Sequence, residues 1–414
     1  MLRSLPPAGH PIRMRTIFSA FLSPSEEVCF LKEFNSDIPI YLVSSGSAAL
    51  VVALSCLKYQ SRKNQVTLPA YSCPSVIAAI IKAGLEPVLC DLRPNSLGMD
   101  FDEVCAKTGP DTLAIIAVHL FGIPENIIEL KGLAQKRGII LIEDAAQAFG
   151  NKVHLSPRSS PLNAYGYLGS FGDIGILSFG RGKPLSLLGG GATLINNQEV
   201  EALAKKQFDF LPQSNHFLFG IRYLINLFLY SVFYHPNLYS IPQKIPGLKL
   251  GETIFTLDFP TQKMNSYVLR IGNKLMPNFD SIRKRRVELM RIYAEKLESF
   301  KEEFAFFPKF NGEDIALLRF PMIFKDRGKR DRILIELKKR GLGATGMYPV
   351  PLNEQKGVSS YLVTKGFYPN AKFVSERILT LPIHEHVRVE DIDHIRQIIE
   401  KHFAKSNTPI EPKK

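Results

Sequence analysis

The chain has 414 residues, of which 45% are hydrophobic and 22% charged, which is typical of a globular protein with room for two domains. Its formal net charge of +13 favours anionic partners, such as phosphorylated substrates or a membrane surface. The sequence contains no aromatic-and-basic motif of an RNA-binding module, so we expect no nucleic-acid partner. It also contains no run of about 20 uninterrupted apolar residues, so no membrane span is predicted.

The cysteines indicate a reducing compartment. They form no C-x-x-C pair and no metal-ligand spacing, so we expect buried thiols and no metal site. The apolar run at 17–22 is too short for a signal peptide, which favours a cytoplasmic location. The five are Cys29, Cys56, Cys73, Cys90 and Cys105.

Strands and helices alternate from residue 40 onward, as in α/β proteins with a mostly parallel sheet covered on both faces. Residues 1–39 are predicted to form an arm with one helix near 24–34. The expected strands are 40–43, 66–68, 87–91, 112–118, 139–142, 174–179 and 192–195, and the expected helices between them are 48–57, 74–83 and 125–137.

The alternation is interrupted between residues 199 and 260. Segment 217–234 is apolar nearly all round, so as a helix it is either buried or faces a membrane. Packing in the core or at a subunit interface is the first interpretation, and peripheral membrane contact is the second.

The pattern resumes with a long helix over 264–300 that breaks near Pro277. A strand at 317–324, a helix at 332–340, a strand at 378–382 and a helix at 389–403 follow. We therefore predict an N-terminal arm plus a large domain over 1–260, a smaller C-terminal α/β domain over 261–404 and a disordered tail over 405–414.

Four polar residues fall at or just past predicted strand ends, where parallel α/β sheets bind their ligands. Lys183 is the most distinctive of them, because glycines flank it and Pro184 biases it to an extended conformation. A lysine held in this way suits Schiff-base chemistry, although a solvated surface loop is the alternative. A phosphate-binding P-loop is excluded because proline follows the lysine. The other three are Ser47, His119 and Asp144.

The neighbours of these residues suggest a phosphorylated ring. Ser47 lies at the start of a helix, whose N–H groups suit a phosphate, and Ser178 lies close enough in sequence to Lys183 to bind the same phosphate. A buried Asp144 needs a positive partner such as a protonated pyridine nitrogen, and Gln147 could donate to a phenolic oxygen. The alternative for Asp144 is to cap the helix predicted after it. These parts suit pyridoxal phosphate, an electron sink.

At this point the sequence resembles the DegT/DnrJ/EryC1/StrS aminotransferases, which act largely on nucleotide-linked keto sugars. The matching motifs keep the family's order across about residues 40–400. They are GSAAL at 46–50, VHLFG at 118–122, EDAAQA at 143–148, Gly172-Asp173 followed by Ser178-Phe179 and Lys183, and YPVPL at 348–352.

The resemblance implies a fold type I pyridoxal-phosphate enzyme that works as a homodimer. Lys183 would bind the cofactor covalently and shuttle protons, Asp144 would pair with the ring nitrogen, and Gln147 would bond the ring hydroxyl. The phosphate would be held by Ser47, Ala48 and Ser178. An amino donor, commonly glutamate, and a nucleotide-linked keto sugar would be the substrates, in polysaccharide or glycoconjugate biosynthesis.

Two departures from the family pattern stand out. The aromatic residue that usually stacks on the cofactor ring is replaced by Cys73, with Tyr71 nearby. Thr261 stands where the family has an asparagine that reaches the partner subunit's phosphate.

Two other functions stay open at this stage. One is a different cofactor-dependent reaction such as sugar dehydration, although dehydratases that resemble this family carry histidine in place of the lysine. The other is a non-catalytic sensor or membrane-associated protein, suggested by the basic charge and by segment 217–234.

Overall fold

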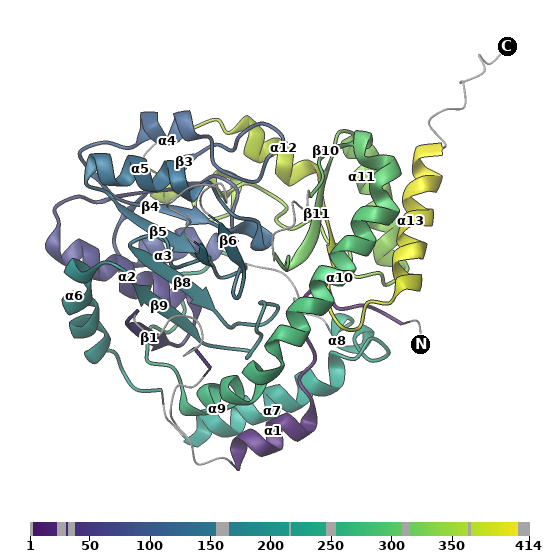
Figure 1. The fold of residues 1–414 in the computed structure, drawn as a ribbon, viewed down its shortest axis with the longest axis horizontal. Coiled ribbons are helices and arrows are strands. Elements are labelled where there is room, and N and C mark those ends of the chain that lie inside the picture. Colours follow the sequence, from purple (N-terminus) through teal and green to yellow (C-terminus); the bar gives the residue numbers. More distant parts are fainter. Residues whose placement is uncertain are drawn as a thin grey trace.

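A computed structural model describes residues 3–22, 30–31, 38–154, 165–214, 217–245, 254–308, 315–362 and 366–404. A seven-stranded sheet carries helices on both faces, and a three-stranded sheet with its own helices lies beside it (Figure 1). The large sheet has the order β1-β9-β8-β5-β4-β2-β3 and is parallel from β8 to β3, whereas β9 pairs antiparallel with β8 and β1. The predicted mostly parallel α/β sheet is therefore confirmed. Its strands are β1 (Ile40–Val43), β2 (Gln65–Pro69), β3 (Glu86–Cys90), β4 (Thr112–Val118), β5 (Ile140–Asp144), β8 (Ile174–Ser178) and β9 (Gly191–Ile195).

Strand β4 explains why these strands are apolar without alternation. All seven of its residues are buried, because successive side chains enter different cores on the two faces of the sheet. Ala114 and Ile116 belong to the core with α2 and α3, whereas Ile115 and Ala117 belong to the core with α4 and α5. The helices on these faces are α2 (Gly46–Gln60), α3 (Pro74–Lys82), α4 (Phe101–Lys107), α5 (Ile127–Arg137) and α6 (Gln198–Asp209).

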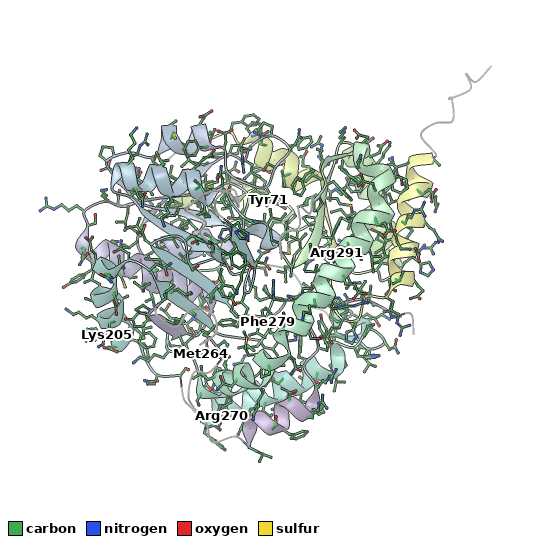
Figure 2. All side chains as sticks on the ribbon, viewed as in Figure 1. Tyr71, Lys205, Met264, Arg270, Phe279 and Arg291 are labelled. Atoms are coloured by element: carbon green, nitrogen blue, oxygen red, sulfur yellow. The ribbon has the colours of Figure 1, made fainter. Side chains whose placement is uncertain are left out.

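Helices α1 (Met14–Phe21), α7 (Phe217–Phe233) and α9 (Ser266–Leu275) lie together at one side of the molecule (Figure 1). They share a core with the sheet, and Met264 and Phe279 lie between the sheet and these helices (Figure 2). The helix predicted at 217–234 is confirmed, but only one of its faces is buried. Most of the helix predicted near 24–34 lies outside the described residues. The short α8 (Ser240–Gln243) follows α7.

The smaller sheet is antiparallel and has its own apolar core. The long helix predicted over 264–300 breaks near Pro277 as expected, into α9, η2 (Met276–Asn278) and α10 (Phe279–Leu297). The other elements of this part are η3 (Glu298–Glu303), β10 (Phe304–Phe306), β11 (Arg319–Phe324), α11 (Arg327–Lys339), η4 (Leu352–Glu354), η5 (Ser359–Tyr361), α12 (Pro369–Arg377), β12 (Ile378–Pro382) and α13 (Val389–Ala404). Two further elements lie between strands of the large sheet in the sequence. They are the turn η1 (Leu120–Gly122) and the hairpin of β6 (Lys152–His154) and β7 (Tyr165–Tyr167).

Side chains from the large sheet bind backbone groups beside the small one. The two carboxylate oxygens of Asp91, just after β3, accept the N–H groups of Asn370 and Ala371 at 2.9 and 2.8 Å, at the start of α12. The Asn151 side chain accepts the N–H of Ala316 at 3.0 Å and donates to the carbonyl of Gly122 at 3.1 Å. The division into domains near residue 260 stays a prediction, and the predicted tail over 405–414 lies outside the described residues.

Candidate active site

A cavity of about 700 Å³ opens at the carboxyl ends of β4, β5 and β8. We call this end of the cavity the strand end. All but one of the site residues predicted from the sequence line it. Ala48 is the exception, since it is fully buried and lies outside the lining. The predicted residues that line the cavity are Ser47, His119, Asp144, Gln147, Ser178 and Lys183.

Lys183 is held on a tight loop that leaves β8. Its N–H bonds to the carbonyl of Gly180 at 3.3 Å, and Gly182 adopts a φ of 74°, a left-handed conformation that favours glycine. The lysine is only partly buried and lines the cavity together with Arg181. The loop therefore presents its amine to a ligand rather than to the core.

Asp144 is the last residue of β5 and is 8% exposed. Its Oδ1 accepts the N–H of Ala146 at 3.0 Å. Burial raises the pKa of this carboxyl above its ordinary value, and the positive charge of Lys183 acts in the opposite direction. Residues 146–150 form turns instead of a helix, so the alternative role as a helix cap is wrong. A buried acid of this kind fits a cationic ring nitrogen, because such a partner stabilises its charged form.

The start of α2 comes very close to β8 at the strand end. Ser45 caps the helix, and its side chain accepts the N–H of Ala48 at 3.1 Å. A Cβ added to Gly46 would lie 2.6 Å from the Cβ of Ser178, so only glycine fits there. Ser47 and Ser178 thus face the same cavity across a gap that suits a phosphate at a helix N-terminus. The N–H of Ala48 is already used by the cap.

Gln147 links the turn η1 to the segment around Tyr348. Its Oε1 accepts the N–H of Phe121 at 3.0 Å, and its Nε2 donates to the hydroxyl of Tyr348 at 3.2 Å. Tyr348 comes from the segment before β12 and lines the cavity. The hydroxyl of Tyr71 bonds the backbone of Tyr348 twice, as donor to its carbonyl and acceptor of its N–H. Of the two candidates for ring stacking, Cys73 lines the cavity, whereas Tyr71 is 1% exposed and supports Tyr348.

His119 directly follows β4 and is fully buried, and it also lines the cavity. Its Nδ1 accepts the N–H of Glu125 at 3.1 Å, which leaves Nε2–H to donate to Glu143 at 3.0 Å. Burial alone raises the pKa of Glu143, but the bonds from His119 and from Gly169 and Gly172 lower it overall. This pair fixes the ends of β4 and β5 beside Asp144, a role that the sequence motif did not reveal.

The opposite end of the cavity, which we call the α7 end, was not predicted. The N-terminal arm, α7 and α8 form most of it, with aromatic and apolar side chains. Its lining residues include Ala8, Leu229, Tyr230, Phe233, Tyr239 and Ile245.

Arg319, the first residue of β11, is a buried cation in this cavity. It is 5% exposed, and its Nη1 donates to the hydroxyls of Thr345 at 2.6 Å and Thr380 at 3.3 Å. Burial lowers its pKa to about 10, against the opposing influence of Tyr348 and Tyr239. Among the described residues, no carboxylate lies within 4.0 Å of its guanidinium. A buried guanidinium without an acidic partner is suited to an anionic ligand.

The DegT/DnrJ/EryC1/StrS aminotransferase family model matches residues 38–211 and 260–400. The chain therefore belongs to this family of pyridoxal-phosphate-dependent aminotransferases, and the predicted enzyme class and cofactor are confirmed. The strand end falls in the matched ranges, whereas α7 and α8 fall in the unmatched segment 212–259.

Individual relatives extend over most of the chain. It is 26% identical, over 86% of this chain and 82% of the relative, to the UDP-N-acetyl-3-dehydro-alpha-D-glucosamine 3-aminotransferase of Acidithiobacillus ferrooxidans. It is 24% identical, over 91% and 90%, to a pleiotropic regulatory protein of Geobacillus stearothermophilus. Among solved structures, the pyridoxal-phosphate form of the putative sugar aminotransferase Spr1654 of Streptococcus pneumoniae matches with a TM-score of 0.73 and 19% identity, covering 98% of this chain and all of that one. This last likeness confirms the fold.

Proposed function

We propose that this aminotransferase moves an amino group from glutamate to a nucleotide-linked keto sugar, in polysaccharide or glycoconjugate biosynthesis. The observation that carries the proposal is a single cavity that joins a partly buried lysine, a buried acid and two serines beside a helix start. The relative from Acidithiobacillus ferrooxidans, named for a UDP-linked keto sugar, supports the substrate class.

The proposed roles follow from what each side chain offers. When bound, pyridoxal phosphate supplies an electron sink for bonds at the carbon that carries the amine. Lys183 would hold the cofactor covalently and carry a proton to and from that carbon. Asp144, already buried, would hold the ring nitrogen in its protonated form. Gln147 would orient the cofactor ring by a hydrogen bond to the ring's hydroxyl group. Ser47 and Ser178 would bind the phosphate.

Positive charge in the cavity supports an anionic substrate. Arg319 lies buried without an acidic partner among the described residues, and Arg181 lines the same cavity close to Lys183 in the chain. Either the carboxylates of glutamate or the diphosphate of a nucleotide-linked sugar would satisfy these guanidinium groups. The strand end would thus perform the chemistry and the arginines would select the substrate.

An absorbance scan of the purified protein tests the role of Lys183. We expect a visible band from the bound cofactor that disappears in Lys183→Ala and persists in Lys205→Ala, which removes an exposed lysine of α6. A band that survives unchanged in Lys183→Ala contradicts the proposed attachment. Absence of any band after incubation with the cofactor would contradict the proposed cofactor site.

Product analysis separates transamination from sugar dehydration. Incubation with a nucleotide-linked keto sugar and glutamate should yield an amino sugar and 2-oxoglutarate in equal amounts. A product that has lost a hydroxyl group and gained no nitrogen would favour the dehydratase alternative. The presence of lysine at position 183, where those dehydratases carry histidine, supports transamination.

A further inference from the structure

Helix α7 exposes apolar side chains where a surface helix normally carries polar ones. Its buried side is a single stripe of Gly220, Tyr223, Leu227 and Tyr230. On the rest of the helix, the polar exposed residues are Arg222 and Asn226. Six large apolar side chains are exposed by 42–77%, namely Phe217, Leu218, Ile221, Ile225, Phe228 and Leu229. A contiguous exposed stripe of this kind indicates a surface that another structure covers.

Helix α1 continues this apolar face. It contacts both α7 and α9, and the three helices lie together in Figure 1. Phe18 of α1 and Leu22 just after it are 60% and 85% exposed. We call the exposed residues of α1, α7 and α9 the α7 face. It extends over helices that are far apart in the sequence, so it is a feature of the folded protein.

The charge of the α7 face identifies its occupant. The sequences of α1, α7 and α9 contain no aspartate and no glutamate. Each of the three helices carries an exposed basic residue, namely Arg15, Arg222 and Lys274. Apolar side chains beside basic ones, without acids, match the interface of a bilayer that contains anionic lipids. A second copy of this face would bring like charges together, which argues against self-association through it.

We propose that the α7 face docks on the surface of an anionic membrane. Helix α7 has 17 residues, and no helix in the described part of the chain is long and apolar enough to cross a bilayer. The helix would therefore lie in the plane of the interface, with its exposed side chains among the lipid headgroups and upper acyl chains. The docking does not depend on the proposed reaction.

Docking in this way would bring the active-site cavity to the lipid surface. Leu229 and Ile245 are 44% and 53% exposed, and both also line the α7 end of the cavity. Tyr230 and Phe233, on the same helix, continue this lining inward. One helix thus contributes to the membrane-facing surface and to the wall of the substrate site.

Sedimentation of the full-length, cofactor-loaded protein with vesicles tests the proposal. We expect binding to vesicles of phosphatidylcholine with about 30% phosphatidylglycerol and weak binding to phosphatidylcholine alone, because the basic residues contribute. Phe228→Asp should lower the partition coefficient roughly tenfold or more, since a large apolar contact is lost. Arg222→Glu should lower it at least about fivefold.

Matched controls lie on α11, away from the α7 face (Figure 1). Ile335→Asp changes an apolar residue that is 67% exposed, and Lys338→Glu reverses an exposed lysine. Both should leave vesicle binding unchanged. Ile225→Gln, a milder change in α7, tests the α7 face again without placing a charge there. The melting curve of every variant compared should match that of the wild type.

Two results would overturn the proposal. One is equal vesicle binding by wild type and Phe228→Asp. The other is no binding to anionic vesicles, together with light scattering that shows a wild-type dimer becoming a monomer in Phe228→Asp. That second pattern would identify a second copy of the chain as the occupant of the α7 face.

Discussion

The strand end and the α7 end of the cavity are built from different kinds of sequence. Residues of the strand end lie at the ends of strands or shortly after them, within short motifs, as Asp144 ends β5 and Lys183 follows β8. The α7 end combines the N-terminal arm with α7 and α8, and those two helices fall in a segment that the family model does not match. The difference separates the part of the cavity that the family model covers, where we propose the cofactor chemistry, from a part that it does not cover, where we propose contacts with the substrate.

The strongest test of the comparison acts on the strand end. In Asp144→Asn we expect the turnover rate to fall by about two to four orders of magnitude, because losing one partner of a buried charge pair costs about 3–5 kcal/mol. Steady-state kinetics and the absorbance of the bound cofactor measure the effect. Asp209→Asn, an exposed acid at the end of α6, is the control and should match wild type. A turnover rate within threefold of wild type in Asp144→Asn would remove Asp144 from the cofactor site.

A second test acts on the arm that leads to the α7 end. Nε2 of the buried His10 accepts the N–H of Ser186 at 2.8 Å, so the ring is neutral. Burial lowers its pKa to about 4, and the charge of Arg286 adds to this effect. Its contribution to stability is therefore complete above pH 6.5 and is lost as the pH falls toward 4.

When the pH falls from 7 to 5, we expect protonation of this histidine alone to lower the free energy of unfolding by about 2 kcal/mol. Denaturant unfolding at both pH values measures the loss, which should be smaller by that amount in His10→Asn. The variant also distinguishes the contribution of His10 to this loss from the contributions of His384 and His386. Burial lowers the pKa values of those two residues to about 3 and about 4. An identical loss in wild type and variant would contradict the assignment.

The third test acts on substrate selection and has the smallest expected effect. Arg319→Met should raise the KM for one anionic substrate about tenfold while the cofactor's absorbance stays unchanged, since a charge-assisted bond of about 1.5 kcal/mol is lost. Arg319→Lys should recover part of that loss. The substrate whose KM responds, glutamate or the sugar nucleotide, is the one that Arg319 binds. Unchanged KM values for both would exclude it from substrate binding.

The sequence predicted the large sheet well because local patterns determine its strands. The strands at 112–118 and 378–382 have the predicted bounds in β4 and β12. Asp144 and Ser178 end strands that the apolar runs already define, so the sequence alone indicates that these two residues share one edge of the sheet. Helix α6 was missed, since charged residues hide its short apolar stripe of Val200 and Ala204.

The α7 end could not be predicted in the same way. Arg319 begins an ordinary apolar strand, and its place in the cavity depends on how the small sheet packs against the large one. The all-round apolar pattern of α7 is interpreted first as packing in the core or at a subunit interface, and within one chain the fold buries one face only. Patterns along a helix report which side chains are apolar, and tertiary packing decides which of them are covered.

The hydrogen bonds that Asp91 and Asn151 make to backbone groups beside the small sheet have a mechanical consequence. Asp91 accepts the N–H of Asn370, Asn151 accepts the N–H of Ala316, and Tyr71 donates to the carbonyl of Tyr348. A hinge motion that moved the small sheet away from the large sheet would have to break the hydrogen bonds of all three residues together. We therefore expect the two sheets to move as one rigid unit when substrates enter the cavity.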